Sequence, residues 1–315
     1  MGSELVKQLL ERGWTVRATA RDVSDGRVGH LHRLAAALPG KLTLHEADLL
    51  RTGDFDSLVA GADFVFHTAS PFAIEVADPE AQLVRPAVEG TRNVLSACAK
   101  AGERLKRVVL TSSVAAVRGG KSAAPPKKGL LYTEEDWNET STVANGEAYW
   151  VSKTEAERAA WDVARSHGFS LAVVAPNFVM GPVLSSALPD PLSVGFMKAW
   201  LEGKASSGEI AFAPDVRDVA KAHILAATSP KAHMQRYIVS NASATSPAAI
   251  SRILQARFGS VYSIPASSEE CDMKPSVDNS KIQRDLGLTL TPIEQTLEDM
   301  AVSMIALGIA NPRAK

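Results

Sequence analysis

The sequence predicts an α/β fold in which helices alternate with the strands of a mostly parallel sheet. Short apolar runs, rich in β-branched residues, predict strands at residues 15–20, 41–47, 62–69, 107–113, 170–176 and 236–240. Helical patterns lie between them at about 79–101, 147–167 and 216–228, and a first helix precedes the first strand. Because parallel strands need such crossovers, this order of elements favours a doubly wound sheet.

The composition is that of an ordinary globular protein and argues against several classes of function. The 315 residues carry a net charge of −1, whereas a general binder of nucleic acid or membrane surfaces shows an excess of Lys and Arg. No apolar run reaches the ~18–20 residues of a membrane span, and the first residues do not resemble a targeting peptide. Cys98 and Cys271 are too few for a disulfide framework, so we expect a cytoplasmic protein.

The first residues depart from the order that a dinucleotide-binding sheet of the Rossmann type requires. Such a fold opens with a strand, a glycine-rich turn and then a helix. Here the helix begins at once, no G-x-G-x-x-G occurs, and Gly2 stands where the last glycine of that turn would lie. Either the fold is a different one, or the first strand and most of the phosphate loop are missing. In the second case we expect strands 15–20 and 62–67 to flank a gap unless they pair directly, with low stability and little activity.

A tyrosine and a lysine four residues apart are the main candidates for catalysis. Tyr149 and Lys153 lie one turn apart on one face of the helix predicted at 147–167. A nearby ammonium favours phenolate over phenol, which lowers the pKa of a tyrosine and suits it to proton transfer. The strand at 107–113 ends in two hydroxyls, Ser112 and Ser113, where a hydroxyl could hold a carbonyl oxygen or make ordinary turn hydrogen bonds.

Residues at the ends of two further strands indicate the nucleotide. An arginine after the second strand of such a fold accommodates the 2′-phosphate of NADP, whereas an acid there selects NAD. Arg21 and Arg27 therefore favour NADPH, although surface arginines are common. Asp48 and Leu49 close the next strand and either meet the adenine or, for Asp48, cap a helix. The seven histidines show no metal-ligand spacing, and His67 is expected in the core.

Five stretches together resemble the extended short-chain dehydrogenase/reductase superfamily. Within it they are most similar to the group of dihydroflavonol reductases, cinnamoyl-CoA reductases and fungal aldehyde/ketone reductases. The stretches are LVKQLLERGWTVRATARD, LTLHEADLLRTGDFDSLVAGADFVFHTASP, RVVLTSSVAAV, EAYWVSKTEAERAAW and PNFVMGP, in the expected order over roughly residues 2–230. The resemblance implies a doubly wound Rossmann-type sheet with a smaller, irregular C-terminal lobe.

The resemblance also implies site residues and a cofactor. Ser113, Tyr149 and Lys153 would be catalytic, and NADPH would be the cofactor, with no metal. Besides Tyr149 and Lys153, the residues implied to contact NADPH are Gly2 from the glycine turn, Arg21 and Arg27 at the 2′-phosphate, Asp48 and Leu49 at the adenine, Thr68, Ala69 and Ser70 after the strand at 62–69, and the segment from Pro176 to Val179 at the nicotinamide.

Two departures from this group bear on the substrate. Plant cinnamoyl-CoA reductases carry N-W-Y-C-Y-G-K around the tyrosine, whereas this chain has E-A-Y-W-V-S-K, which disfavours cinnamoyl-CoA. The asparagine with which dihydroflavonol reductases hold the flavonoid corresponds to Arg118 here. Neither substrate is therefore carried over to this chain.

The leading hypothesis is an NADPH-dependent reductase that transfers hydride to the aldehyde or ketone carbonyl of a small or phenolic substrate. One alternative is a nucleotide-sugar epimerase or dehydratase of the same superfamily, but Val114, Ala115 and Ala116 stand where a dehydratase wants an acid. Another is a non-catalytic dinucleotide-binding protein, against which the Tyr149/Lys153 pair argues.

This hypothesis divides the chain into a core and a lobe. Residues 1–176 would form the dinucleotide-binding core, and 177–315 mainly the substrate-binding lobe, with about 210–240 returning to the core. The pattern loosens in the lobe, where prolines recur at 182, 189 and 191. The expected partner is a small-molecule carbonyl compound, without nucleic acid or membrane, and the sequence predicts no oligomeric state.

Overall fold

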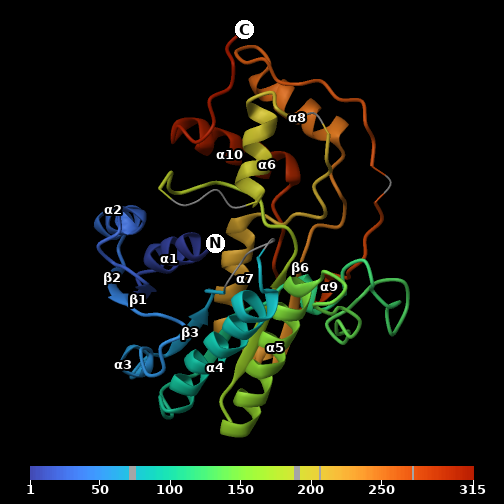
Figure 1. The fold of residues 1–315 in the computed structure, drawn as a ribbon. Helices are drawn as coiled ribbons and strands as arrows, with labels where there is room; N and C mark the ends of the chain where they lie inside the picture. Colours follow the sequence, from blue (N-terminus) through green and yellow to red (C-terminus); the bar gives the residue numbers. More distant parts are fainter. Residues whose placement is uncertain (71–75, 188–191, 206, 272) are drawn as a thin grey trace.

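Strands and helices alternate along the chain in the predicted order (Figure 1). The structure is a computed structural model that describes residues 1–70, 76–187, 192–205, 207–271 and 273–315. Its strands are β1 (Thr15–Ala20), β2 (Lys41–Glu46), β3 (Phe64–His67), β4 (Arg107–Thr111), β5 (Leu171–Pro176) and β6 (Gln235–Val239). Its helices are α1 (Gly2–Glu11), α2 (Gly29–Ala37), α3 (Asp56–Val59), α4 (Arg85–Ala99), α5 (Ala148–His167), α6 (Leu192–Leu201), α7 (Val216–Thr228), α8 (Pro247–Phe258), α9 (Ser280–Leu286) and α10 (Ile293–Ala306). Short turns of helix add η1 (Gly26–Val28), η2 (Glu80–Val84), η3 (Val114–Ala116) and η4 (Pro230–Ala232).

Four strands form a parallel sheet in the order β3-β4-β5-β6. Every residue of β5 is buried, and four of the five residues of β4 are too. A strand that is covered on both faces reads as a continuous apolar run, and RVVLT and LAVVAP show this pattern. The predicted parallel α/β architecture is confirmed.

The first two strands form a second, separate parallel sheet, in which Thr15 of β1 pairs with Lys41 of β2. Within the described residues, no hydrogen-bonded ladder joins β1 to β3, so the two strands do not pair directly. Side chains connect the two sheets instead, because the ring of Trp14 stacks on that of Phe64 with centres 5.4 Å apart.

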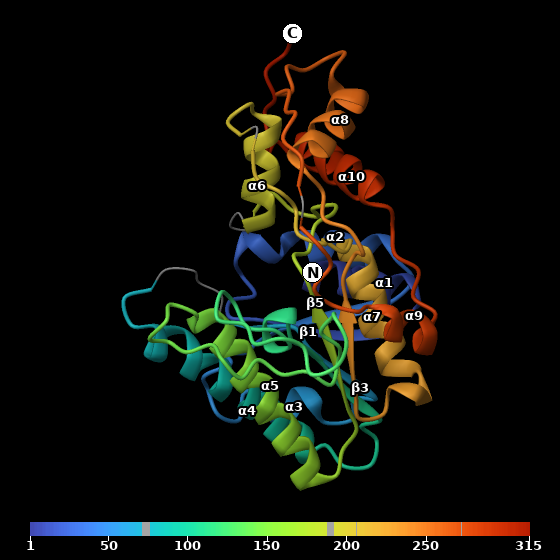
Figure 2. The same ribbon diagram turned by 90° about the vertical axis from the view of Figure 1, so that its right-hand side faces the viewer.

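Alternate residues of β4 face two different layers of helices. Val108 and Leu110 pack with α4 and α5, in a cluster that includes Trp161. Val109 points to the other face and packs with α7, where Val219 lies. Successive side chains of a strand point to opposite faces, so this division follows directly from the sequence RVVLT. Figure 2 shows α4 and α5 on one side of the sheet and α7 on the other.

A second core lies among the helices α6, α8 and α10 (Figure 2). Trp200, Leu254 and Met300 are buried there. Long segments without helix or strand join these helices, among them residues 259–271 and 273–279 except for one bridge at Tyr262 and one at 277. Of the prolines expected to interrupt this part of the chain, those at 189 and 191 lie outside the described residues.

Part of the chain after residue 177 returns to the first core. Helix α7 packs against β4 and β5, and β6 forms the edge of the four-stranded sheet beside β5. Cys98 carries a free thiol and is buried in α4. None of the described helices is both long enough and apolar enough to cross a bilayer.

Candidate active site

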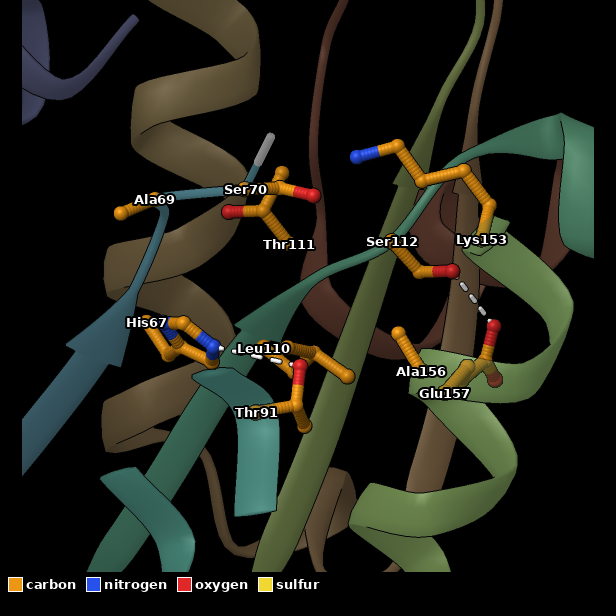
Figure 3. Close-up of a pocket in the computed structure, with 10 residues that line it drawn as sticks. All are labelled: His67, Ala69, Ser70, Thr91, Leu110, Thr111, Ser112, Lys153, Ala156 and Glu157. Carbon is orange, nitrogen blue, oxygen red and sulfur yellow. Dashed lines mark hydrogen bonds between the residues drawn. The ribbon is translucent and has the colours of Figure 1, made fainter. Parts of the chain in front are cut away.

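The candidate active site lies where β3 and β4 end beside the first turns of α5 (Figure 3). Helix α5 begins at Ala148, so Tyr149 lies in its first turn and Lys153 one turn later, on the same face. The ammonium nitrogen of Lys153 lies 5.7 Å from the centre of the Tyr149 ring. The predicted spacing therefore does bring the phenol and the ammonium together.

Ser113 completes this group because β4 ends at Thr111 and the chain turns into η3. A hydrogen bond links the hydroxyl of Ser113 to the phenol of Tyr149. The Ser113 oxygen also accepts the backbone N–H of Ala115 at 3.1 Å, which caps η3. The same hydroxyl therefore makes the expected turn hydrogen bond and also contacts the tyrosine, whereas its hold on a carbonyl oxygen stays a prediction.

The neighbouring Ser112 points away from Tyr149 and into the core. Its hydroxyl donates to Glu157 Oε2 at 2.6 Å, as Figure 3 shows, and Glu157 is 1% exposed. Glu157 also accepts from Trp161 Nε1 at 3.0 Å and from Arg236 Nη2 of β6 at 3.2 Å. Glu157 therefore joins the end of β4, the helix α5 and the edge strand β6.

Sequence reasoning missed Glu157 and Arg236. The signal for Glu157 was its position four residues after Lys153, which places it on the same face of the helix. Arg236 carried no comparable signal, because its partners Glu157 and Trp137 are distant in sequence and are brought to it by the fold; its guanidinium lies 4.0 Å from the centre of the Trp137 ring.

Burial shifts the pKa values of both catalytic candidates. It lowers the pKa of Lys153 to about 8, because a buried ammonium loses its hydration. It raises the pKa of Tyr149 above the usual value, and the hydrogen bond to Ser113 only partly opposes this. The expectation that Lys153 lowers the pKa of Tyr149 is therefore wrong for the protein by itself, since burial raises this pKa and the opposing effect comes from Ser113.

A small cavity of about 10 Å³ lies beside Lys153. That volume holds about one water molecule. Ala69 and Ser70, which follow β3, line it together with Ser112 and Lys153 (Figure 3). Two of the three residues expected after this strand therefore reach the site.

The third, Thr68, lies beside the start of α1. A Cβ atom on Gly2 would lie 3.4 Å from Thr68 Oγ1, so this end of α1 and the loop after β3 meet closely. Pro176 is the last residue of β5 and pairs with Val239. Val179 packs against the buried cluster around β5, β6 and α7.

A larger pocket, of about 230 Å³, lies between the start of α1, the end of β1 and the loop that leads to α2. Arg21 and Arg27 both line it, together with Asp22 and Asp25. Asp25 forms an ion pair with Arg27 and also accepts the backbone N–H of Arg27 at 2.8 Å. The two arginines expected at one phosphate therefore share a pocket, in which Arg27 already has a carboxylate partner.

Asp48 and Leu49 lie in the loop after β2. Oδ1 of Asp48 accepts the backbone N–H of Leu50 at 2.9 Å, and α3 begins only at Asp56, so Asp48 caps a turn rather than a helix. The carbonyl of Leu49 accepts from Asn93 of α4 at 2.8 Å, which fixes the loop on that helix.

The remaining expectations concern the histidines, a metal and the substrate. His67 lies on β3, is 4% exposed as predicted for a core histidine, and also lines the small cavity beside Lys153. Among the described residues no cluster of His, Cys, Asp or Glu could hold a metal ion. The segment 114–116 forms η3 and brings no carboxylate next to Ser113. Arg118 donates from Nη1 to Ser276 Oγ at 2.9 Å, which ties the loop after β4 to the C-terminal part of the chain.

This fold and this site define the class to which the chain belongs. Residues 1–240 match the profile of the NAD dependent epimerase/dehydratase family, and the chain is a member of that family. The membership confirms the resemblance to extended short-chain dehydrogenases/reductases that the motifs indicated.

Individual relatives are similar over nearly their whole length. Cinnamoyl-CoA reductase CAD2 of Medicago truncatula is 38% identical over 321 residues, which cover 99% of this chain and 94% of that protein. Tetraketide alpha-pyrone reductase 1 of Arabidopsis thaliana is 36% identical over 313 residues, which cover 98% and 93%. The crystal structure of yeast methylglyoxal/isovaleraldehyde reductase Gre2, complexed with NADPH, has a TM-score of 0.83 at 28% identity and covers 98% of this chain and 96% of that one.

Proposed function

We propose that this protein is an NADPH-dependent reductase that converts an aldehyde or ketone carbonyl to an alcohol. The observation that carries the proposal is the group of Ser113, Tyr149 and Lys153, in which a half-buried phenol is hydrogen-bonded to a hydroxyl beside a half-buried lysine. The relatives named above support it, because each is named as a reductase and the yeast structure contains NADPH.

The polar residues of the two pockets suit this cofactor. Arg21 and Arg27 provide guanidinium groups, whose planar fork matches the oxygens of a phosphate. Lys153 brings an ammonium to the carboxyl ends of the strands, where ligands of doubly wound sheets bind. When bound, NADPH supplies the hydride that the carbonyl carbon accepts.

The residues of this chain handle the proton and the developing charge on oxygen. Tyr149 gives its phenolic proton to the carbonyl oxygen as that oxygen becomes an alkoxide, and Ser113 holds the same oxygen by a hydrogen bond. Burial keeps Tyr149 protonated near neutral pH, which is the form that reduction requires. Lys153 stabilises the phenolate that remains, and solvent then restores the proton.

The substrate class follows from the same comparison. We propose a small or phenolic aldehyde or ketone, bound in the lobe of residues 177–315, which the chain enters directly after β5. Arg118 stands where dihydroflavonol reductases carry an asparagine, and the cinnamoyl-CoA motif around the tyrosine is absent from the sequence. Isovaleraldehyde and cinnamoyl-CoA therefore make a useful pair of probes, of which we expect only the first to be reduced.

The compartment is a further part of the proposal. Cys98 carries a free thiol in the structure, which suits a reducing compartment such as the cytoplasm.

The test replaces Tyr149 by phenylalanine, which keeps the ring and removes the proton donor. We expect kcat for isovaleraldehyde reduction to fall by ~10²-fold or more, because a positioned general acid contributes about that much. NADPH binding, measured by fluorescence titration, should change by less than about threefold, since most of the cofactor contacts remain.

The matched control is Tyr262→Phe. Tyr262 packs at the edge of the lobe core, far along the chain from α5, so loss of its hydroxyl should leave turnover within about twofold. Undiminished turnover of Tyr149→Phe would overturn the proposed role of Tyr149. Failure of the unchanged protein to bind NADPH would overturn the proposed function as a whole.

A further inference from the structure

The pocket that contains Arg21 also contains a histidine for which the proposed function gives no role. His30 lies in the first turn of α2 and is 5% exposed. It lines the pocket of about 230 Å³ together with Ser3 of α1 and the two arginines. The inference below rests on the proposed use of NADPH and concerns how this pocket recognises the cofactor.

Two hydrogen bonds fix which nitrogen of His30 carries a hydrogen. Nδ1 lies 3.0 Å from the carbonyl oxygen of Arg27, and Nε2 lies 2.8 Å from the hydroxyl of Ser3. A carbonyl oxygen only accepts, so Nδ1 carries the hydrogen and Nε2 of neutral His30 accepts from Ser3. In this state Ser3 turns only oxygen lone pairs toward the pocket, which repel a phosphate.

The formal charges around the pocket cancel before an anion enters. Arg21 and Arg27 contribute two positive charges, and Asp22 and Asp25 two negative ones. Hydrogen bonds from neighbouring residues hold the pKa of both carboxyl groups below their usual range, so both stay ionised. A phosphate dianion therefore brings uncompensated charge. Among the described residues that line the pocket, His30 is the one whose ordinary pKa allows it to gain a proton near neutral pH.

We propose that His30 takes up a proton when the 2′-phosphate of NADPH binds, and that Ser3 then donates its own hydroxyl hydrogen to the phosphate in a hydrogen bond. A proton on Nε2 makes the ring a donor to the Ser3 oxygen. The hydroxyl hydrogen of Ser3 is then released and donates to a phosphate oxygen. The proton comes from solvent, and no covalent bond to the phosphate forms. NADH lacks this phosphate and leaves His30 neutral, so the pair favours NADPH.

Burial, together with the charges nearby, keeps His30 neutral until the phosphate binds. Burial lowers its pKa below the ordinary value, the hydrogen bond to the carbonyl of Arg27 partly opposes this, and the positive charge of Arg33 on α2 adds to the lowering. The two arginines and two aspartates of the loop after β1 oppose each other in sign. A bound dianion would reverse the balance, because it favours the imidazolium.

Calorimetry of cofactor binding in two buffers of different ionisation enthalpy counts the protons taken up. At pH 7 we expect the unchanged protein to take up about half a proton or more per NADPH beyond the His30→Asn variant. The asparagine amide still donates to the carbonyl of Arg27 but cannot be protonated. With NADH the two proteins should take up the same number of protons. The ratio of NADPH to NADH affinity should fall about tenfold in the variant at pH 6.5.

Two further variants separate this role from a structural one. Ser3→Ala keeps the imidazole but removes the hydroxyl. It should also lose the extra proton uptake and show the same fall in the ratio of NADPH to NADH affinity. His32→Asn, on the same helix but exposed, should behave as the unchanged protein does. Ser3→Ala serves as the test if His30→Asn melts at a much lower temperature.

The outcomes distinguish this inference from the proposed function. Equal proton uptake by the unchanged protein and His30→Asn would overturn the inference while leaving NADPH as the cofactor. Extra uptake with NADH as well would assign the proton to the pyrophosphate and would also overturn it. An unchanged protein that does not bind NADPH would overturn both the proposed function and the inference.

Discussion

The two parallel sheets of this protein are built from the same kind of ladder but differ in how they are covered. In the four-stranded sheet, β4 and β5 are buried between α4 and α5 on one face and α7 on the other. In the two-stranded sheet, residues of β1 alternate between exposed and half-buried. The four-stranded sheet carries the candidate catalytic residues at its strand ends, and β1 leads into the arginine pocket. The more deeply buried sheet is thus the one that carries the residues proposed to do the chemistry.

The hydrogen bonds within each sheet do not connect the two sheets to each other, so the junction between them depends on other contacts. β1 and β3 belong to different sheets, and backbone groups on their facing edges do not pair with each other. An unpaired buried backbone group costs about 1–3 kcal/mol. Contacts between side chains, such as Trp14 on Phe64, hold the two sheets together without replacing those hydrogen bonds.

Acid should destabilise the four-stranded part most. Burial lowers the pKa of His67 on β3 and of His223 on α7 to about 4 each. Between about pH 4 and 6.5 the unfolded chain binds protons that the folded protein does not, so stability falls as the pH falls through this window. Each histidine should cost about 3 kcal/mol by pH 4, measured by urea unfolding across pH.

The control for this effect is a pair of glutamine variants. His223→Gln should remove roughly half of the pH dependence, because the amide cannot be protonated there. His32→Gln, an exposed position on α2 beside the two-stranded sheet, should change the slope little. An identical slope for both variants would contradict the assignment to the buried histidines.

Truncation of one leucine in each sheet compares the two parts directly. Leu171→Ala on β5 removes a fully buried side chain and should cost about 2–5 kcal/mol. Leu42→Ala on β2 removes a half-buried one and should cost less than about 1.5 kcal/mol. Urea unfolding checks both values, provided that the dependence of the unfolding free energy on urea concentration is the same in the variants and the unchanged protein. Equal costs would mean that the two-stranded sheet is as tightly packed as the other.

A strand supplied between β1 and β3 should reduce the difference between the two sheets. A segment of about six β-branched residues, joined ahead of Met1 by a short glycine turn, could pair with both facing edges. We expect it to raise the free energy of unfolding by about 2 kcal/mol, seen as a melting temperature several degrees higher. The control is a glycine-serine segment of equal length, which removes the same buried amino group of Met1 but forms no strand. If both segments act alike, the facing edges do not accept a strand.

The strands and helices were predictable because each apolar run keeps one period. β1 and α7 match the sequence interpretation to the residue, at 15–20 and 216–228. The strands β3 and β4 are shorter than their apolar runs, since the last residues of each run leave the ladder and form the site. A run of suitable residues marks a strand, but it does not show where the chain turns away.

The candidate site was predictable only where its residues lie close in sequence. Tyr149 and Lys153 are one helical turn apart, so spacing alone places them together. The residues alone left Ser112 and Ser113 open and the resemblance implied Ser113; the partner that draws Ser112 into the core, Glu157, lies on another element and needed the structure. The pKa of Tyr149 also could not be predicted, since burial depends on the whole fold.

The junction at Glu157 has a consequence for how new substrate preferences can arise. It fastens α5, the helix of the proposed proton donor Tyr149, to Ser112 after β4 and to the edge strand β6, using groups that all lie within the first core. These contacts, which place α5 against the sheet, therefore involve no residue of the helices α6, α8 and α10. If the substrate binds in the lobe as proposed, we expect exchanges of residues in those helices to change substrate preference without changing the surroundings of Tyr149. For engineering, we expect that substrate preference and proton donation can be changed by substitutions in different parts of the chain.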